Sequence, residues 1–200
     1  EASVNDSPWH CKCDVCVKVN EDEGGGRGAG GPQVLLVNAI AERAAKQYPN
    51  ALIKTMFYQS DPPQKTRLAT NVVLETVSTI DWRYPFDDLS KPGNRYSAEG
   101  WEKSRRAVGD GSLYVWEKHQ IAFGDYFRPN PNLHYIAHNI GIMIDKYRLK
   151  GYFAQNTQSP GTDLQTLRYY LLARAMWRPQ NDSRRELEEF CRLYYGPAAH

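Results

Sequence analysis

Short apolar segments alternate with longer amphipathic segments along this chain, and this alternation limits the folds open to it. The apolar segments span residues 2–5, 51–58, 72–77, 113–116 and 151–153. They are rich in aliphatic and β-branched residues without strict polar alternation, which is typical of parallel strands buried on both faces. Helical periodicity is present at residues 33–48, 96–108, 131–148, 162–177 and 183–195. Strands alternating with helices predict βαβ units and a parallel sheet.

Five strands with helices after most of them fit either an open doubly wound sheet or part of a (β/α)8 barrel of the TIM type. Both α/β folds place their chemistry at the carboxyl ends of the strands. No Gly-x-Gly-x-x-Gly follows a strand and no Gly-x-x-x-x-Gly-Lys-Ser/Thr occurs, so a nucleotide site lacks support. We interpret the glycine-rich run at residues 24–31 as a flexible loop. The 200 residues are enough for one domain with a sizeable core.

The last two expected helices begin with the spacing of a capping box. Thr162 precedes Gln165 by three residues, and Ser183 precedes Glu186 by three. In this arrangement the hydroxyl caps the first turn while the Glu or Gln side chain reaches back to it. Gly196 follows the last helical segment and predicts its end.

Composition excludes some partners and leaves others open. With 25 basic and 23 acidic residues the formal net charge is +2, and the scattered Lys and Arg do not indicate nucleic-acid binding. No apolar run reaches the roughly 18–20 residues of a membrane helix. Tyr and Trp together outnumber Phe, with 13 Tyr and 5 Trp against 6 Phe. Their apolar faces and polar edges suit sugar binding, and they equally suit the helix–sheet interface of a barrel.

Two carboxylates follow expected strands and are the candidate catalytic residues. Asp6 comes after the first strand, and Glu117 comes directly after Trp116. Each has an ordinary alternative, a turn or N-cap aspartate for Asp6 and a surface ion pair for Glu117. Together, at one edge of a parallel sheet, they match the two-carboxylate acid/base mechanism of glycoside hydrolysis.

Polar and aromatic residues near the same strand ends are candidates for binding sugar hydroxyls and rings. The long segment at residues 78–95 contains several aromatic residues, and it is interpreted either as a functional lid or as a packed surface loop. The candidate substrate-binding residues are Asn5, Tyr58, Gln59, Trp82, Trp116, His119, Gln155 and Asn156.

Three of the four cysteines form the pattern Cys11-x-Cys13-x-x-Cys16. Thiolates this close in sequence can share a metal ion, and a structural zinc is one interpretation. A local disulfide and reduced thiols packed in the loop are the others, because no fourth metal ligand is obvious from the sequence. No further cofactor is expected.

Several motifs occur together in a fixed order, and this set resembles a bacterial family known as domain of unknown function 4838. That family is similar to the alpha-glucuronidases, which are glycoside hydrolases with a (β/α)8 barrel. The residues that carry the resemblance are Asn5-Asp6, Cys11-x-Cys13-x-x-Cys16, Trp116-Glu117, Pro131-Asn132-Leu133, Gly151-Tyr152-Phe153-Ala154-Gln155 and Tyr194-Tyr195-Gly196-Pro197-Ala198-Ala199.

The resemblance implies that residues 1–200 are one partial barrel domain, about strands four to eight, with the earlier strands outside this chain. It places Asp6 after strand four as the acid and Glu117 after strand seven as the base. It also implies a carbohydrate substrate and a secreted or periplasmic location. The family often has an acidic residue where this chain has Ala154, which implies altered or lost activity in this member.

Three functions therefore remain as expectations. The first is a glycoside hydrolase acting on a polysaccharide or oligosaccharide. The second is a carbohydrate-binding barrel without catalysis, which Ala154 favours. The third is a metal-dependent hydrolase centred on the cysteines. A barrel piece is also expected to leave core residues such as Val4 and Phe153 at an open edge.

Overall fold

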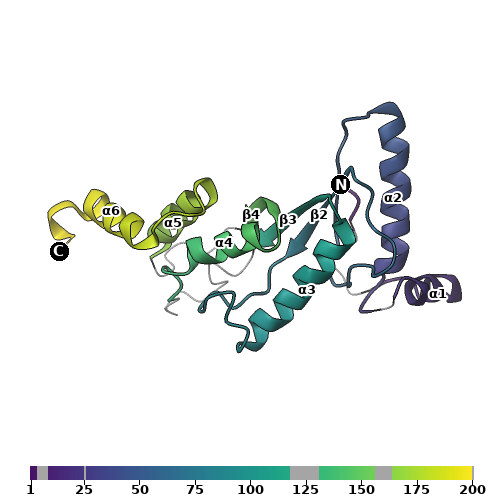
Figure 1. Cartoon of the computed structure of the whole chain (residues 1–200), viewed down its shortest axis with the longest axis horizontal. Coiled ribbons are helices and arrows are strands. Elements are labelled where there is room, and N and C mark those ends of the chain that lie inside the picture. The colour runs from purple at the N-terminus through teal and green to yellow at the C-terminus, as the bar shows by residue number, and fades with distance from the viewer. Residues whose placement is uncertain (4–8, 25, 118–130, 156–163, 200) are drawn as a thin grey trace. The chain divides into compact units, whose positions relative to one another are not determined.

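The computed structural model describes residues 1–3, 9–24, 26–117, 131–155 and 164–199 (Figure 1). Its strands are β1 (Ile53–Met56), β2 (Val72–Val77), β3 (Ser112–Glu117) and β4 (Leu149–Ala154). They form one parallel sheet in the order β1-β2-β3-β4, which is also their order along the chain. The predicted α/β class is confirmed, and a parallel sheet alternating with helices is compatible with part of a TIM-type barrel.

Each helix predicted from the sequence is present, but the bounds of some differ from the prediction. The helices are α1 (Asp14–Asp22), α2 (Gly30–Gln47), α3 (Pro92–Val108), α4 (Ile136–Asp145), α5 (Gln165–Trp177) and α6 (Ser183–Tyr195), followed by the 3-10 turn η1 (Gly196–Ala198). Helix α3 begins earlier than predicted, at Pro92, because proline fits the first helical position well. Helix α4 is shorter than predicted, because the sequence pattern extends over residues 131–148. Helix α1 was not predicted.

The chain divides into two compact units, which are described separately below. The first comprises residues 1–77, 98–116 and 149–153, and contains almost all of the sheet together with α1, α2 and most of α3. The second comprises residues 78–97, 117–148 and 154–200, and contains α4, α5 and α6.

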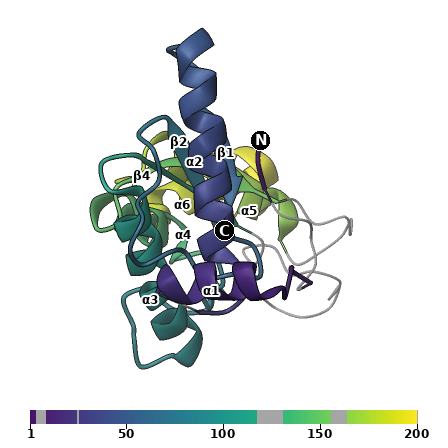
Figure 2. The ribbon, with the colours of Figure 1, turned by 90° about the vertical axis from the view of Figure 1, so that its right-hand side faces the viewer.

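In the first unit, α2 packs on one face of the sheet (Figure 2). The side chain of Gln33 donates hydrogen bonds to Thr55 Oγ1 at 3.1 Å and to the Met56 carbonyl at 2.9 Å. Strand register places Leu74 beside Thr55 and Leu113 beside Leu74, so these two apolar side chains share the face that α2 covers. Side chains alternate along a strand, so the neighbouring positions point to the opposite face of the sheet.

The first residues of the chain lie along the outer edge of β1. The Ala2 amide donates to the Lys54 carbonyl at 2.8 Å, and Thr55 Oγ1 donates to the Ala2 carbonyl at 2.7 Å. This agrees with a chain segment entering the sheet there, although residues 1–3 are not assigned as a strand and Val4 lies outside the described residues. Phe153, expected at an open edge, is 49% exposed.

In the second unit, buried amide side chains hold the aromatic loop. Asn94 Oδ1 accepts from the Asp81 amide at 2.8 Å, and Asn139 Oδ1 accepts from the Phe86 amide at 2.7 Å. Trp82 and Phe86 are 2% and 1% exposed. The loop is therefore packed into the protein, the second of its two interpretations.

The capping box predicted at the start of α6 is wrong. The N-cap is Asp182, whose carboxylate accepts from the amides of Arg184 and Arg185. Glu186 does not reach back to the cap, because its carboxylate binds Arg174 of α5 at 2.7 Å. The other predicted cap, Thr162, lies outside the described residues.

Candidate functional site

The face of the sheet opposite α2 has an aromatic surface formed by Tyr114, Trp116 and Phe153, here called the aromatic face. Tyr114 and Trp116 alternate along β3 with the buried Leu113 and Val115, so they point away from α2. The rings of Trp116 and Phe153 meet edge to face, with centroids 5.1 Å apart and an interplanar angle of 87°. Neighbouring strands thus place two aromatic side chains together near their carboxyl ends.

A glycine on β4 makes room for the third ring. A Cβ atom on Gly151 would lie 2.4 Å from Tyr114 Cδ2 and Cε2, well inside van der Waals contact. The tyrosine ring therefore lies against the glycine backbone. Any side chain at position 151 would force the Tyr114 ring or the strand to move.

A charged pair lies on the same face of the sheet. Glu75 is in register with Tyr114, and its Oε2 is 3.2 Å from Lys54 Nζ. The Glu75 side chain is 5% exposed, and Glu1 also lies 3.5 Å from the Lys54 ammonium. Desolvation lowers the pKa of Lys54, but the hydrogen bonds and charges of Glu75 and Glu1 together outweigh it, so the pKa is raised overall.

Glu75 is a site residue that the sequence interpretation missed. It lies in the run Val72-Val73-Leu74-Glu75-Thr76-Val77, in which all the remaining residues are apolar or β-branched. A single carboxylate inside such a buried strand was the signal, because an unpaired buried charge is costly and therefore implies a partner.

Glu117 and Gln155, both predicted site residues, lie next to each other at the strand ends. Glu117 is the last residue of β3, and Gln155 directly follows β4. The Gln155 amide donates to the Glu117 carbonyl at 2.8 Å. Glu117 is 1% exposed. Because successive side chains along a strand point to opposite faces of the sheet, its side chain points away from the face that carries Trp116.

Tyr58 and Gln59 follow β1 in a tight turn and are both half-buried. Gln59 has φ 57°, in the left-handed region that is unusual for a residue with a side chain. The adjoining glycine-rich loop fits closely against this turn, because a Cβ on Gly28 would lie 2.8 Å from the Gln59 carbonyl oxygen. The close contact between the glycine-rich loop and this turn therefore determines the path of the chain after β1.

The other predicted site residues fall into two groups. Trp82 is buried in the second unit and presents no ring face to solvent in this structure. Asn5, Asp6, His119 and Asn156 lie outside the described residues, so the pairing of Asp6 with Glu117 stays a prediction.

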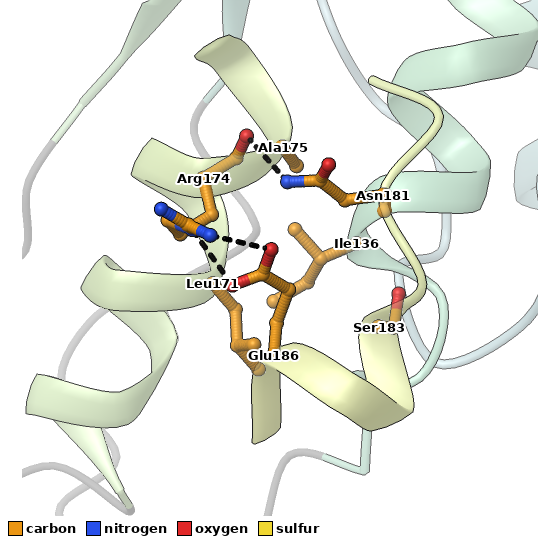
Figure 3. Close-up of a pocket in the computed structure, with 8 residues that line it drawn as sticks. Ile136, Leu171, Arg174, Ala175, Asn181, Ser183 and Glu186 are labelled. Atoms are coloured by element: carbon orange, nitrogen blue, oxygen red, sulfur yellow. Dashed lines mark hydrogen bonds and ion pairs between the residues drawn. The ribbon is translucent and has the colours of Figure 1, made fainter. Parts of the chain in front are cut away.

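A small cleft lies between α4, α5 and the start of α6 in the second unit (Figure 3). It contains about 190 Å³ of empty space, part of which is open to solvent, and its lining includes Ile136, Leu171 and Ser183. Its charged groups bind each other: Glu186 accepts from Arg174 Nε at 2.7 Å and from Nη2 at 2.9 Å. The hydrogen bond from Arg174 lowers the pKa of Glu186. We assign this pair a structural role.

The three clustered cysteines converge at the start of α1. Cys13 is the N-cap, Cys16 lies in the first turn, and their sulfur atoms and that of Cys11 all lie within 4.8 Å of one another. The pKa of Cys13 is lowered, chiefly by the backbone N–H of Cys16 and then by the neighbouring thiols. The pKa of Cys16 is raised to about 11, chiefly by its hydrogen bond with Cys13. All three are free thiols here.

Comparison with known proteins assigns a family without an activity. The family described as "Domain of unknown function (DUF4838)" matches residues 1–200, and the chain belongs to it. No curated protein and no solved structure matches the chain. Among the described residues, no helix is both long enough and apolar enough to cross a membrane.

Proposed function

We propose that this member of the DUF4838 family binds carbohydrate on the aromatic face. The observation that carries the proposal is the edge-to-face pair of Trp116 and Phe153, beside the carboxyl ends of β3 and β4. Sugar rings have an apolar C–H face and a rim of hydroxyl groups. Aromatic side chains match the first, and polar groups at a strand edge match the second.

The exposure of these side chains makes the aromatic face accessible to a ligand. Phe153 is 49% exposed, and Trp116 and Tyr114 are half-buried, on a sheet whose other face is covered. The pair of the half-buried Lys54 and the buried Glu75 on the same face provides polar groups within an apolar setting. An apolar surface with a few placed polar groups is the usual composition of a small-molecule site.

Binding is tested by calorimetric titration with neutral and uronic-acid-bearing oligosaccharides. Trp116→Ala and Phe153→Ala are expected to weaken binding at least about tenfold, which corresponds to about 1.4 kcal/mol. Trp177→Ala is the matched control, because Trp177 is 83% exposed at the end of α5, in the other unit. Equal affinities in all three variants would refute the aromatic face as the sugar site.

Glycoside hydrolysis is the second candidate function. The position of Glu117 at the end of β3, bonded through its backbone to Gln155 after β4, favours it. Asp6 and Glu117 would then act as the acid and base, with their carboxyl groups about 5–10 Å apart. Two observations favour binding without hydrolysis instead. Glu117 points away from the face that carries Trp116. Ala154 ends β4 at the position where the family often has an acidic residue.

Substitution of the two carboxylates separates these functions. If the protein hydrolyses glycosides, Asp6→Asn and Glu117→Gln should each reduce the rate at least about 10²-fold, the usual minimum for losing an acid–base group. Sugar affinity should survive both changes. Glu188→Gln is the control, because Glu188 lies on the exposed surface of α6. Retained sugar affinity with no hydrolysis by the unaltered protein would leave binding as the function.

A further inference from the structure

Helix α1 lacks the apolar support that short helices need. None of its nine residues, all of which the structure describes, is buried. Val15 and Val17 are 72% and 42% exposed. Isolated helices shorter than about 12–15 residues are marginal in water, and most helices in proteins depend on packing of an apolar face. Hydrophobic burial therefore gives α1 little stability, and other interactions have to contribute.

Polar contacts hold the carboxyl-terminal half of α1 and the residue that follows it. Asn20 Oδ1 accepts from the Gly31 amide at 3.1 Å. The Glu23 carboxylate accepts from the Thr66 amide and hydroxyl, each at 2.8 Å. The cysteine cluster lies at the opposite end, across the first turn.

We propose that Cys11, Cys13 and Cys16 bind one zinc ion through three thiolates, with a solvent molecule in the fourth position. Zinc–sulfur bonds of about 2.3 Å in tetrahedral geometry separate the sulfurs by about 3.8 Å. The three sulfurs already lie within 4.8 Å of one another, so each pair has to approach by at most about 1 Å. The ion would join the segment before α1 to its first turn.

The other two interpretations of the cysteines account for less of the structure. Packed thiols require burial, but Cys11 and Cys13 are exposed and Cys16 is half-buried. A disulfide joins two sulfurs and leaves the third unexplained, whereas a metal ion uses all three. Soft thiolate ligands select zinc or cuprous copper over hard cations such as magnesium.

The consequence is a local gain in stability that depends on zinc. A site absent from the unfolded chain contributes its binding free energy to folding. Zinc should therefore slow amide hydrogen exchange in α1 and leave the exchange of α6, in the other unit, unchanged. This role is independent of the proposed sugar site.

The test uses the whole chain, reduced and stripped of metal, and titrated with Zn²⁺ alone. We expect one equivalent to bind, and a thiol reagent to react rapidly with one of the four cysteines when zinc is bound and with all four after chelation. Substituted Co²⁺ should show intense sulfur-to-metal charge-transfer absorption. Cys11→Ser, Cys13→Ser and Cys16→Ser should each weaken zinc binding at least about tenfold.

Cys191→Ser is the matched control, because Cys191 is a half-buried cysteine on α6 and should not affect binding. The Co²⁺ spectrum and thiol count of the unaltered chain do not depend on whether any variant folds. Four thiols that stay reactive in excess zinc would overturn the proposal. So would a disulfide among the three cysteines in freshly purified chain, or retention of cuprous copper without zinc.

Discussion

Gly151 of β4 lies directly against the ring of Tyr114 of β3, so close that a Cβ atom on the glycine would lie 2.4 Å from two ring carbons. The two residues come from strands far apart in sequence, and the missing side chain at one position accommodates the ring at the other. Since Tyr114 belongs to the aromatic face, this contact links the packing of the sheet to the proposed sugar site.

Gly151→Ala should therefore destabilise the chain and weaken sugar binding together. Overpacking of this kind usually costs about 1–3 kcal/mol, because the ring or the strand has to move. Urea unfolding would give the change in free energy, and calorimetry would give the change in sugar affinity. Gly100→Ala is the control: its Cβ would meet no described atom within 4 Å, so within α3 it should stabilise by about 0.5–1 kcal/mol. Equal stability for Gly151→Ala and the unaltered chain would contradict the contact.

The start of α6 offers a direct comparison between the sequence pattern and the structure. Asp182→Ala should cost about 1 kcal/mol, because its carboxylate accepts from the amides of Arg184 and Arg185. Ser183→Ala, at the position that the sequence pattern selects as the cap, should change the free energy of unfolding by less than half of that amount. The reverse order of the two effects in urea unfolding would restore Ser183 as the cap.

The elements that the sequence located well have local signals at both ends. The bounds of β2 match the prediction because a run of apolar and β-branched residues defines the strand. The bounds of α6 also match, since Gly196 ends the helix with φ 55°. Helix α1 was not predicted because a helix with no buried residue has no periodic pattern of apolar side chains.

The candidate site was predictable in its residues but not in its arrangement. Trp116 was selected from its place at the end of an expected strand, whereas its contact with Phe153 depends on the pairing of β3 with β4. Glu117 was selected because it follows an expected strand. The direction of its side chain depends on the alternation of side chains along β3, which extends to Glu117 in the structure. Lys54 and Glu75 pair through the register of β1 with β2, which the sequence alone does not specify.

The aromatic loop should depend on Asn139 of α4. Asn139→Ala removes the acceptor for the Phe86 amide and leaves that buried N–H unpaired, at a cost of about 1–3 kcal/mol. Hydrogen exchange at Phe86 should become faster than in the unaltered chain. The neighbouring His138→Ala serves as the control, because His138 Nε2 makes an exposed polar contact with Asp87 Oδ1, and such surface contacts contribute less than about 1 kcal/mol. Unchanged exchange at Phe86 in Asn139→Ala would exclude the hydrogen bond.

The ion pair between Glu186 and Arg174 should make stability depend on acid pH. The hydrogen bond from Arg174 lowers the pKa of Glu186 below its ordinary value of 4.5 in the folded chain. As the pH falls, the Glu186 carboxylate therefore takes up a proton in the unfolded chain before it does so in the folded chain. The contribution of the ion pair to the free energy of unfolding is complete above pH 4.5 and is lost as the pH falls through the pKa of the folded chain. In Glu186→Gln, urea unfolding between pH 6 and about pH 3 should show a shallower loss of stability than in the unaltered chain. Glu188→Gln alters an ion pair with Arg184 whose side chains are 62% and 84% exposed, so its pH dependence should match the unaltered chain. Parallel curves for the unaltered chain and Glu186→Gln would show that Arg174 does not stabilise the Glu186 carboxylate in the folded state.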